Sequence, residues 1–219
     1  MIKGIFFDLD GTLYLSTPIL HSAYAEGIES YNEASGRGVR IPTEQEVLEQ
    51  VGNPVEEIYA NLFPELVPEE RDKMTRRIVS NLLKKINSRG GRLVEGIPAV
   101  LDQLSSKYSL ALVTNAQKAY MDAVVETYEL GKYFSSMICA GEIETNDKAR
   151  LIEISLKRLD LEAEEVVMVG DRISDRKAAE QAGTGFIGCS FGHGSDGSIG
   201  ELKVDSLKEI EALLNDQFL

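Results

Sequence analysis

The sequence predicts an α/β fold, in which a Rossmann-like parallel sheet carries helices on both faces and an all-helical cap domain is inserted after the first strand. Three observations lead to this class. Short continuous apolar runs are typical of strands buried on both faces, and segments with a helical spacing of apolar residues alternate with them. Residues 17–90 break this alternation, because they contain several helical patterns and no clear strand.

The composition is compatible with one full core and a modest second domain, since 43% of the 219 residues are hydrophobic. The formal net charge of −13 favours neither nucleic acid nor an anionic membrane as a partner. Cys139 and Cys189 lie in apolar stretches, as reduced core thiols do, and no apolar run has the length of a membrane span. We therefore expect a cytoplasmic protein that is a monomer or a small homo-oligomer.

Five short apolar runs mark the strands that we expect in the core. Helical patterns follow them, and capping residues mark where two of these helices begin. Asn146 and Asp147 precede one helix, and Ser206 with Glu209 forms a capping box ahead of the last one. The expected strands are residues 5–7, 110–113, 137–140, 166–169 and about 185–188.

The inserted segment is predicted to be a helical domain. Leu20 and Tyr24 belong to an apolar stripe at helical spacing, and Thr43 with Glu46 forms a capping box. Such stripes are typical of packing between helices. The predicted domains are a catalytic core of residues 1–16 and 91–219 and a cap of residues 17–90.

Polar side chains follow three of the predicted strands directly. In open α/β sheets a ligand lies outside the carboxyl ends of the strands, so we expect these side chains to converge at one edge of the sheet. The candidate site residues are Asp8 and Asp10 after the first strand, Thr114 and Asn115 after the second, and Asp171 and Asp175 after the fourth.

Several carboxylates at one edge require compensating positive charge. Two of them ~4 Å apart repel each other by about 4 kcal/mol at an effective dielectric constant near 20. Hard oxygen ligands that leave room for water and a phosphate favour Mg²⁺. Lys148, at the start of the helix after the third strand, is the best candidate for a second positive charge.

These motifs resemble those of the haloacid dehalogenase superfamily, and within it the phosphatases with a helical cap, such as phosphoglycolate phosphatase and beta-phosphoglucomutase. The resemblance covers nearly the whole chain. Its first motif, Asp-x-Asp-Gly-Thr after an N-terminal strand, is matched by residues 8–12 and is highly specific. The other motifs are matched by Thr114 with Asn115, by Lys148, and by Gly-Asp followed by a second acid in residues 170–175.

The resemblance implies catalysis through an aspartyl-phosphate. Asp8 would attack phosphorus, and Asp10 would protonate the leaving oxygen and then activate water. The residues implied for Mg²⁺ are Asp8, Asp10 through its backbone carbonyl, Asp171 and Asp175, and those implied for the phosphoryl oxygens are Thr114, Asn115 and Lys148.

The expected activity is magnesium-dependent hydrolysis of a small phosphorylated metabolite. An acid at position 10 argues against dehalogenases and phosphonatases of the superfamily, which lack it. A phosphomutase would keep the same core residues, and we favour hydrolysis because phosphatases are the commoner outcome of this architecture. A binding protein without turnover is a third alternative, which the presence of Asp8, Asp10 and Asp171 opposes.

The cap is expected to set substrate choice, because it closes over the sheet edge. Residues 51–54, between two helical segments, resemble a specificity loop of the relatives. The sequence departs from the family pattern at two positions next to the motifs. Ala149 follows Lys148 where proline is usual, and Leu15, after the first motif, stands where an Asp is common. The possible anion contacts are Arg37, Arg40 and Lys118.

Overall fold

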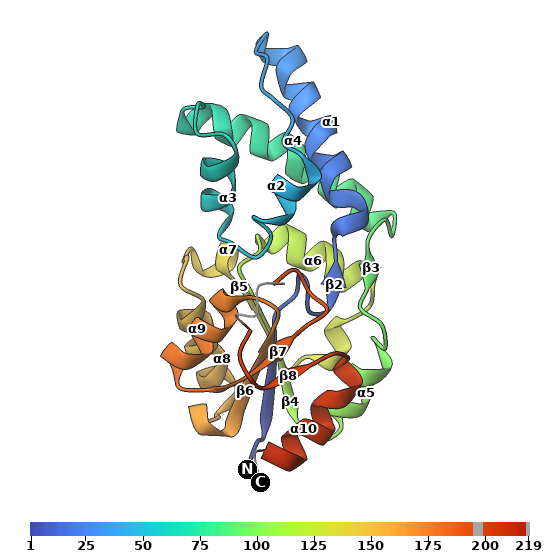
Figure 1. Ribbon diagram of the computed structural model, residues 1–219, viewed down its shortest axis with the longest axis vertical. Coiled ribbons are helices and arrows are strands. Elements are labelled where there is room, and N and C mark those ends of the chain that lie inside the picture. The colour runs from blue at the N-terminus through green and yellow to red at the C-terminus, as the bar shows by residue number, and fades with distance from the viewer. Residues whose placement is uncertain (195–198, 218–219) are drawn as a thin grey trace.

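A six-stranded parallel sheet with helices on both faces forms the lower part of the molecule in Figure 1, a computed structural model that describes residues 1–194 and 199–217. The strand order is β5-β4-β1-β6-β7-β8, so the predicted fold class is confirmed. The strands of this sheet are β1 (Gly4–Phe7), β4 (Ser109–Thr114), β5 (Ser136–Cys139), β6 (Val166–Gly170), β7 (Gly185–Cys189) and β8 (Lys203–Val204).

The central strand β1 shows why the apolar runs of the sequence are continuous. Side chains of a strand alternate between its two faces. Ile5 and Phe7 pack into one apolar cluster and Phe6 into the other, and all three are fully buried. Helices cover both clusters. They are α5 (Ala99–Ser105), α6 (Lys118–Thr127), α7 (Ala140–Ile143), α8 (Lys148–Leu159), α9 (Ile173–Ala182) and α10 (Ile210–Gln217), with 3₁₀ turns at Gly131–Tyr133, Ala163–Glu165 and Leu207–Glu209.

The segment between residues 17 and 90 consists of helices and their connections, and it lies beyond the carboxyl ends of the strands (Figure 1). The two long helices α1 and α4 pack along each other, with Ile28 and Ile78 completely buried. Thr43 and Glu46 form the predicted capping box at the N-terminus of α2. The helices are α1 (Thr17–Ser35), α2 (Glu44–Leu48), α3 (Val55–Leu62) and α4 (Pro68–Asn87).

A small antiparallel pair, β2 (Tyr14–Leu15) and β3 (Arg92–Leu93), joins the two linkers that lead into and out of the helical segment. Neither of these strands is among those expected from the sequence. Two-residue strands carry no alternation that a sequence pattern could reveal, which also explains why β8 was not expected. The domain boundaries at residues 16/17 and 90/91 stay a prediction.

Two of the predicted capping residues, Asp147 and Ser206, accept hydrogen bonds at the starts of their helical segments. Asp147 accepts hydrogen bonds from the N–H groups of Ala149 and Arg150, and Ser206 accepts one from that of Lys208. Glu209, however, accepts from the backbone N–H of Asp205 rather than from that of Ser206, so the predicted second capping box is incomplete. Within the described residues, no helix has the length and apolar character needed to cross a bilayer.

Candidate active site

Three neighbouring strands deliver the candidate site residues to one edge of the sheet. β1 lies between β4 and β6, and Phe7 is in register with both Leu112 and Val169. Asp8, directly after β1, continues this pairing by donating its N–H to the carbonyl of Val169 at 2.9 Å. The next residues of the flanking strands therefore lie on either side of Asp8, with Thr114 at the end of β4.

Asp8, Asp171 and Asp175 form a buried carboxylate cluster, which is at most 3% exposed at each residue. One ligand oxygen from each lies within 4.8 Å of the others. Lys148, the first residue of α8, compensates part of this charge, because its Nζ lies 2.5 Å from Asp8 Oδ1 and 2.5 Å from Asp175 Oδ1. One cation against three carboxylates leaves the ionised cluster with an excess of negative charge.

The excess of negative charge affects the pKa values of the residues in the cluster. Burial raises the pKa of Asp8 well above its ordinary value, and the charges of Asp175 and Asp171 add to the effect against the opposing charge of Lys148. Burial, followed by the charge of Asp175, raises the pKa of Asp171 to about 6. Burial disfavours the charged form of Lys148, but the charges of Asp175 and Asp8 outweigh it and raise the pKa of this lysine. A further cation in the cluster would stabilise the ionised forms of Asp8 and Asp171 and so lower their pKa values.

Backbone groups fix the orientation of the two later carboxylates. The N–H of His193 donates to Asp171 Oδ2 at 2.6 Å, and the N–H of Arg172 donates to Asp175 Oδ2 at 3.0 Å. Thr12 Oγ1 lies 3.4 Å from Asp171 Oδ1. Each carboxylate therefore has one oxygen held by a backbone N–H, and the other oxygen of Asp175 contacts Lys148.

Gly11 explains why glycine follows the two aspartates of the first motif. Its φ is +85°, a region in which residues with a side chain are strained. A Cβ at this position would also overlap the carboxylate of Asp171. The turn after β1 can approach the Asp171 loop this closely only with glycine.

Asp10 is oriented differently from Asp8. Its Oδ1 accepts a hydrogen bond from the hydroxyl of Tyr120 in α6 at 2.6 Å, and its side chain is not part of the three-carboxylate cluster. Burial raises the pKa of Asp10 to about 6, although hydrogen bonds from Tyr120 and Ser16 oppose the rise. A carboxyl with this pKa can gain and lose a proton near neutrality. The expected contribution of the Asp10 backbone carbonyl to a metal site stays a prediction.

The residues after β4 connect the sheet edge to the cap. Asn115 Nδ2 donates to the carbonyl of Gly52 at 3.0 Å, and Arg172 Nη2 donates to the carbonyl of Leu48 at 2.9 Å. Gly52 has a φ of +90°, and a Cβ there would lie 3.3 Å from Arg172 Cγ. These contacts hold residues 48–53 of the cap over the carboxylate cluster.

A cavity lies between this cap loop and the sheet edge. Asp8, Asp10, Thr114 and Asn115 line its floor, and residues 51–53 line its side. The loop that the sequence singled out for substrate choice therefore borders the cavity. The helices of the cap supply most of its other walls: Leu20, Tyr24, Val47, Val55, Ile58, Tyr59, Val79 and Leu82. The rest of the lining is Ser16, Ala116, Gln117 and Tyr120.

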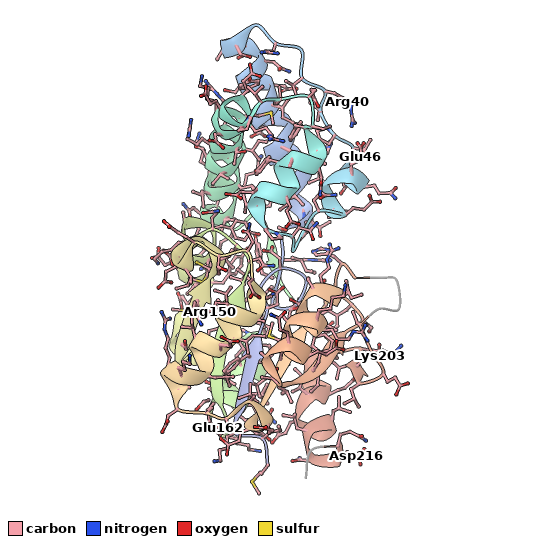
Figure 2. The ribbon with its side chains drawn as sticks, turned by 90° about the vertical axis from the view of Figure 1, so that its left-hand side faces the viewer. Arg40, Glu46, Arg150, Glu162, Lys203 and Asp216 are labelled. Carbon is pink, nitrogen blue, oxygen red and sulfur yellow. The ribbon has the colours of Figure 1, made fainter. Side chains whose placement is uncertain are left out.

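The three possible anion contacts do not line this cavity. Arg40 pairs with Glu46, and both lie on the outer side of the cap (Figure 2). Arg37 pairs with Glu70, and Lys118 pairs with Asp122 on the surface of α6 at 2.7 Å. Their expected role as anion contacts gains no support from these positions.

Tyr120, Arg172 and His193 are the contacts that the sequence reasoning missed. Tyr120 is separated from Asp10 by 110 positions, and Arg172 reaches a carbonyl 124 positions away. His193 acts through its backbone N–H, which no side-chain pattern can reveal. Only Arg172 carried a signal, since it lies inside the fourth motif.

Known proteins resemble this chain over its whole length. The family described as haloacid dehalogenase-like hydrolase matches residues 5–189. Phosphoglycolate phosphatase of Vibrio cholerae is 28% identical over 218 residues, which cover 95% of this chain and 93% of that protein. Phosphoglycolate phosphatase of Vibrio vulnificus is 27% identical over 230 residues, which cover 100% and 96%.

Solved structures share the fold. A predicted phosphoglycolate phosphatase from Haemophilus somnus has a TM-score of 0.85 at 21% identity, covering 97% of each chain. A haloacid dehalogenase-like hydrolase from Streptococcus pneumoniae has a TM-score of 0.82 at 24% identity, covering 96% of this chain and 97% of that one. At these identities the likeness establishes the arrangement of elements.

Proposed function

The chain belongs to the haloacid dehalogenase-like hydrolases, and from this premise we propose that it is a phosphatase that hydrolyses a small phosphate monoester through Asp8. The observation that carries the proposal is the buried contact of Asp8 with Lys148, beside a separate carboxyl at Asp10 whose pKa is about 6. The Asp8 carboxylate, fixed by Lys148, could act as the nucleophile, and the Asp10 carboxyl could act as the general acid and base. The relatives named phosphoglycolate phosphatase support phosphate-ester chemistry.

We propose Mg²⁺ as the cofactor, because the donor set fits a hard divalent cation. Three carboxylates share one lysine, which leaves negative charge that a cation would balance. Mg²⁺ prefers such oxygen ligands and keeps room for water and phosphate oxygens. When bound, it neutralises charge on the transferring phosphoryl group. The residues that would hold it are Asp8, Asp171 and Asp175, with the backbone carbonyl of Asp10.

The reaction would take place in two balanced steps. In the first, an oxygen of Asp8 forms a bond to phosphorus, the bond from phosphorus to the ester oxygen breaks, and Asp10 gives its proton to that oxygen. In the second, water gives a proton to Asp10 and attacks phosphorus, and the bond to Asp8 breaks to release phosphate. The pKa of Asp10 near 6 suits both directions of proton transfer.

Thr114, Asn115 and Lys148 would hold the phosphoryl oxygens. Thr114 Oγ1 accepts from the N–H of Ala116, and a hydroxyl that accepts in this way still has its own hydrogen to donate. Lys148 already points at Asp8 and would follow the charge as it moves onto the phosphoryl group. Such preset donors stabilise the transition state more than the free ester.

Phosphate release tests this proposal. The wild-type protein should release phosphate from phosphate monoesters with Mg²⁺ and not with a chelator. Asp8→Asn should lower the rate at least about a thousandfold, because the substituted amide is a poor nucleophile. Wild-type rates in Asp8→Asn would remove Asp8 from the mechanism.

The same assay separates hydrolysis from phosphomutase activity. A sugar phosphate is incubated with a catalytic amount of its bisphosphate, and isomer and free phosphate are measured together. The proposal requires phosphate release to be faster. Faster isomerisation would identify a mutase with the same core residues.

A further inference from the structure

The wall of the cavity above the carboxylate cluster is apolar. Val79 and Leu82 of α4 and Ile58 of α3 face the space above Asp8 and Asp10. Tyr24 and Tyr59 stack with their ring centroids 6.0 Å apart. Burial raises the pKa of Tyr24 to about 12, so this part of the wall is neutral at physiological pH.

The lining offers no positive charge to an anionic leaving group. All lining residues belong to the described part of the chain, and none of them is Lys, Arg or His. Arg172, a cation at the interface with the cap, directs Nη2 at the carbonyl of Leu48 and packs against Gly52. Lys148 lies beneath the floor, where it is 6% exposed and bound to two carboxylates.

The neighbouring hollow is also unsuited to an anion. It shares Val55, Asn115 and Gln117 with the cavity, and its remaining lining includes Glu56 and Glu144. A carboxylate that extended from the ester oxygen would therefore meet uncharged, mostly apolar side chains in one direction and acids in the other. Burying an ionised carboxylate without a partner is costly, and like charges add repulsion.

We propose that the preferred substrate is a phosphate monoester of an uncharged, apolar alcohol, and that a carboxylate-bearing ester such as phosphoglycolate is disfavoured. This inference rests on the proposed phosphatase function and specifies its substrate class. The alcohol part occupies the space lined by α3 and α4, and the phosphoryl group lies on Asp8. Selectivity then comes from the cost of leaving a carboxylate unpaired against this wall.

A pair of esters of equal shape tests the inference. Isobutyl phosphate and phosphoglycolate place the same number of non-hydrogen atoms beyond the ester oxygen, and only the second carries a carboxylate. We expect kcat/KM for isobutyl phosphate to exceed that for phosphoglycolate at least about tenfold. The electron-withdrawing carboxylate makes glycolate the better leaving group, so intrinsic reactivity would act against this result. A preference of this size for phosphoglycolate, or for phosphoethanolamine, would overturn the inference.

A substitution at Val79 tests the cavity itself. Val79 is half-buried in α4 and faces the lining, so a longer side chain can enter the space. Val79→Lys should shift the ratio of kcat/KM values toward phosphoglycolate by at least about tenfold relative to Val79→Met, which has similar length and no charge. An unchanged ratio would mean that the alcohol part does not bind beside α4.

Binding of inert analogues separates this inference from the proposed function. We expect 3-methylbutylphosphonate to bind the wild-type protein with Mg²⁺ more tightly than 3-phosphonopropionate, measured by calorimetry. If neither ester is hydrolysed, the proposed function fails and the two phosphonates still decide the inference. Tighter binding of 3-phosphonopropionate would contradict it.

Discussion

The floor and the wall of the cavity differ in charge: charged groups gather at and beneath the floor, whereas the wall is formed mainly by apolar side chains. At and beneath the floor, three buried carboxylates and Lys148 come together from separate strand ends and helix starts. At the wall, cap helices present apolar side chains, and no described lining residue carries a positive charge. Chemistry therefore depends on a few residues at fixed positions, whereas selectivity depends on a surface that can change without disturbing them. Changes in the floor should alter rate and stability, and changes in the wall should alter which ester reacts.

Loss of Lys148, beneath the floor, should have the largest effect on stability. Lys148→Met keeps the length of the side chain but removes the cation that pairs with Asp8 and Asp175. Breaking a buried ion pair typically costs about 3–5 kcal/mol of unfolding free energy. Urea unfolding in the presence of a chelator measures this loss. Lys118→Met is the matched control, because its ion pair with Asp122 is exposed and should contribute little. Equal losses in both variants would contradict the difference between buried and surface charge.

Mg²⁺ should stabilise the fold more at about pH 7.5 than at about pH 5. The raised pKa of Asp171, about 6 against an ordinary 3.8, means that its ionised form opposes folding. This penalty is absent below pH ~3.8 and complete above pH ~6. A cation binds the ionised carboxylates and relieves the penalty, giving about 2.7 kcal/mol at a hundredfold excess over Kd. Thermal unfolding with and without Mg²⁺ at both pH values measures this; greater stabilisation at the lower pH would disprove the cluster as the binding site.

Tyr120→Phe should have a smaller effect, confined to proton transfer. In the wild-type protein, the 2.6 Å hydrogen bond from Tyr120 lowers the pKa of the Asp10 carboxyl. Because the substitution removes this bond, the pKa of Asp10 should rise. A lost hydrogen bond of this kind corresponds to about a tenfold decrease in kcat. The pH profile of kcat should shift to higher pH, while KM stays constant. A change in KM alone would show that Tyr120 contacts the substrate rather than positioning Asp10.

Much of the floor could be predicted from the sequence, because it follows from where strands end. The continuous apolar runs identify β1, β4 and β6, and the polar residues after them meet at one edge. Lys148 was found by its place at a helix start, and α8 does begin there. These features are local, so a single pass along the chain reveals them.

The wall and the supporting contacts could not be predicted in the same way. Val79 and Leu82 look like any apolar helix stripe, and only the folded cap shows which of them face the cavity. The hydrogen bonds of Tyr120 to Asp10 and of Arg172 to Leu48 join segments far apart in the chain. Nothing in local spacing distinguishes such a donor from a surface residue.

Trapping the covalent intermediate shows whether Asp8 is the nucleophile and Asp10 the acid–base group. In Asp10→Asn, an ester with a good leaving group, 4-nitrophenyl phosphate, can still transfer its phosphoryl group to Asp8, but no carboxyl is present to activate water. With Mg²⁺, we expect one equivalent of nitrophenolate per protein and mass spectrometry of a peptide that carries one phosphoryl group on Asp8. An unmodified Asp8 peptide, with phosphate released continuously, would contradict these roles of Asp8 and Asp10.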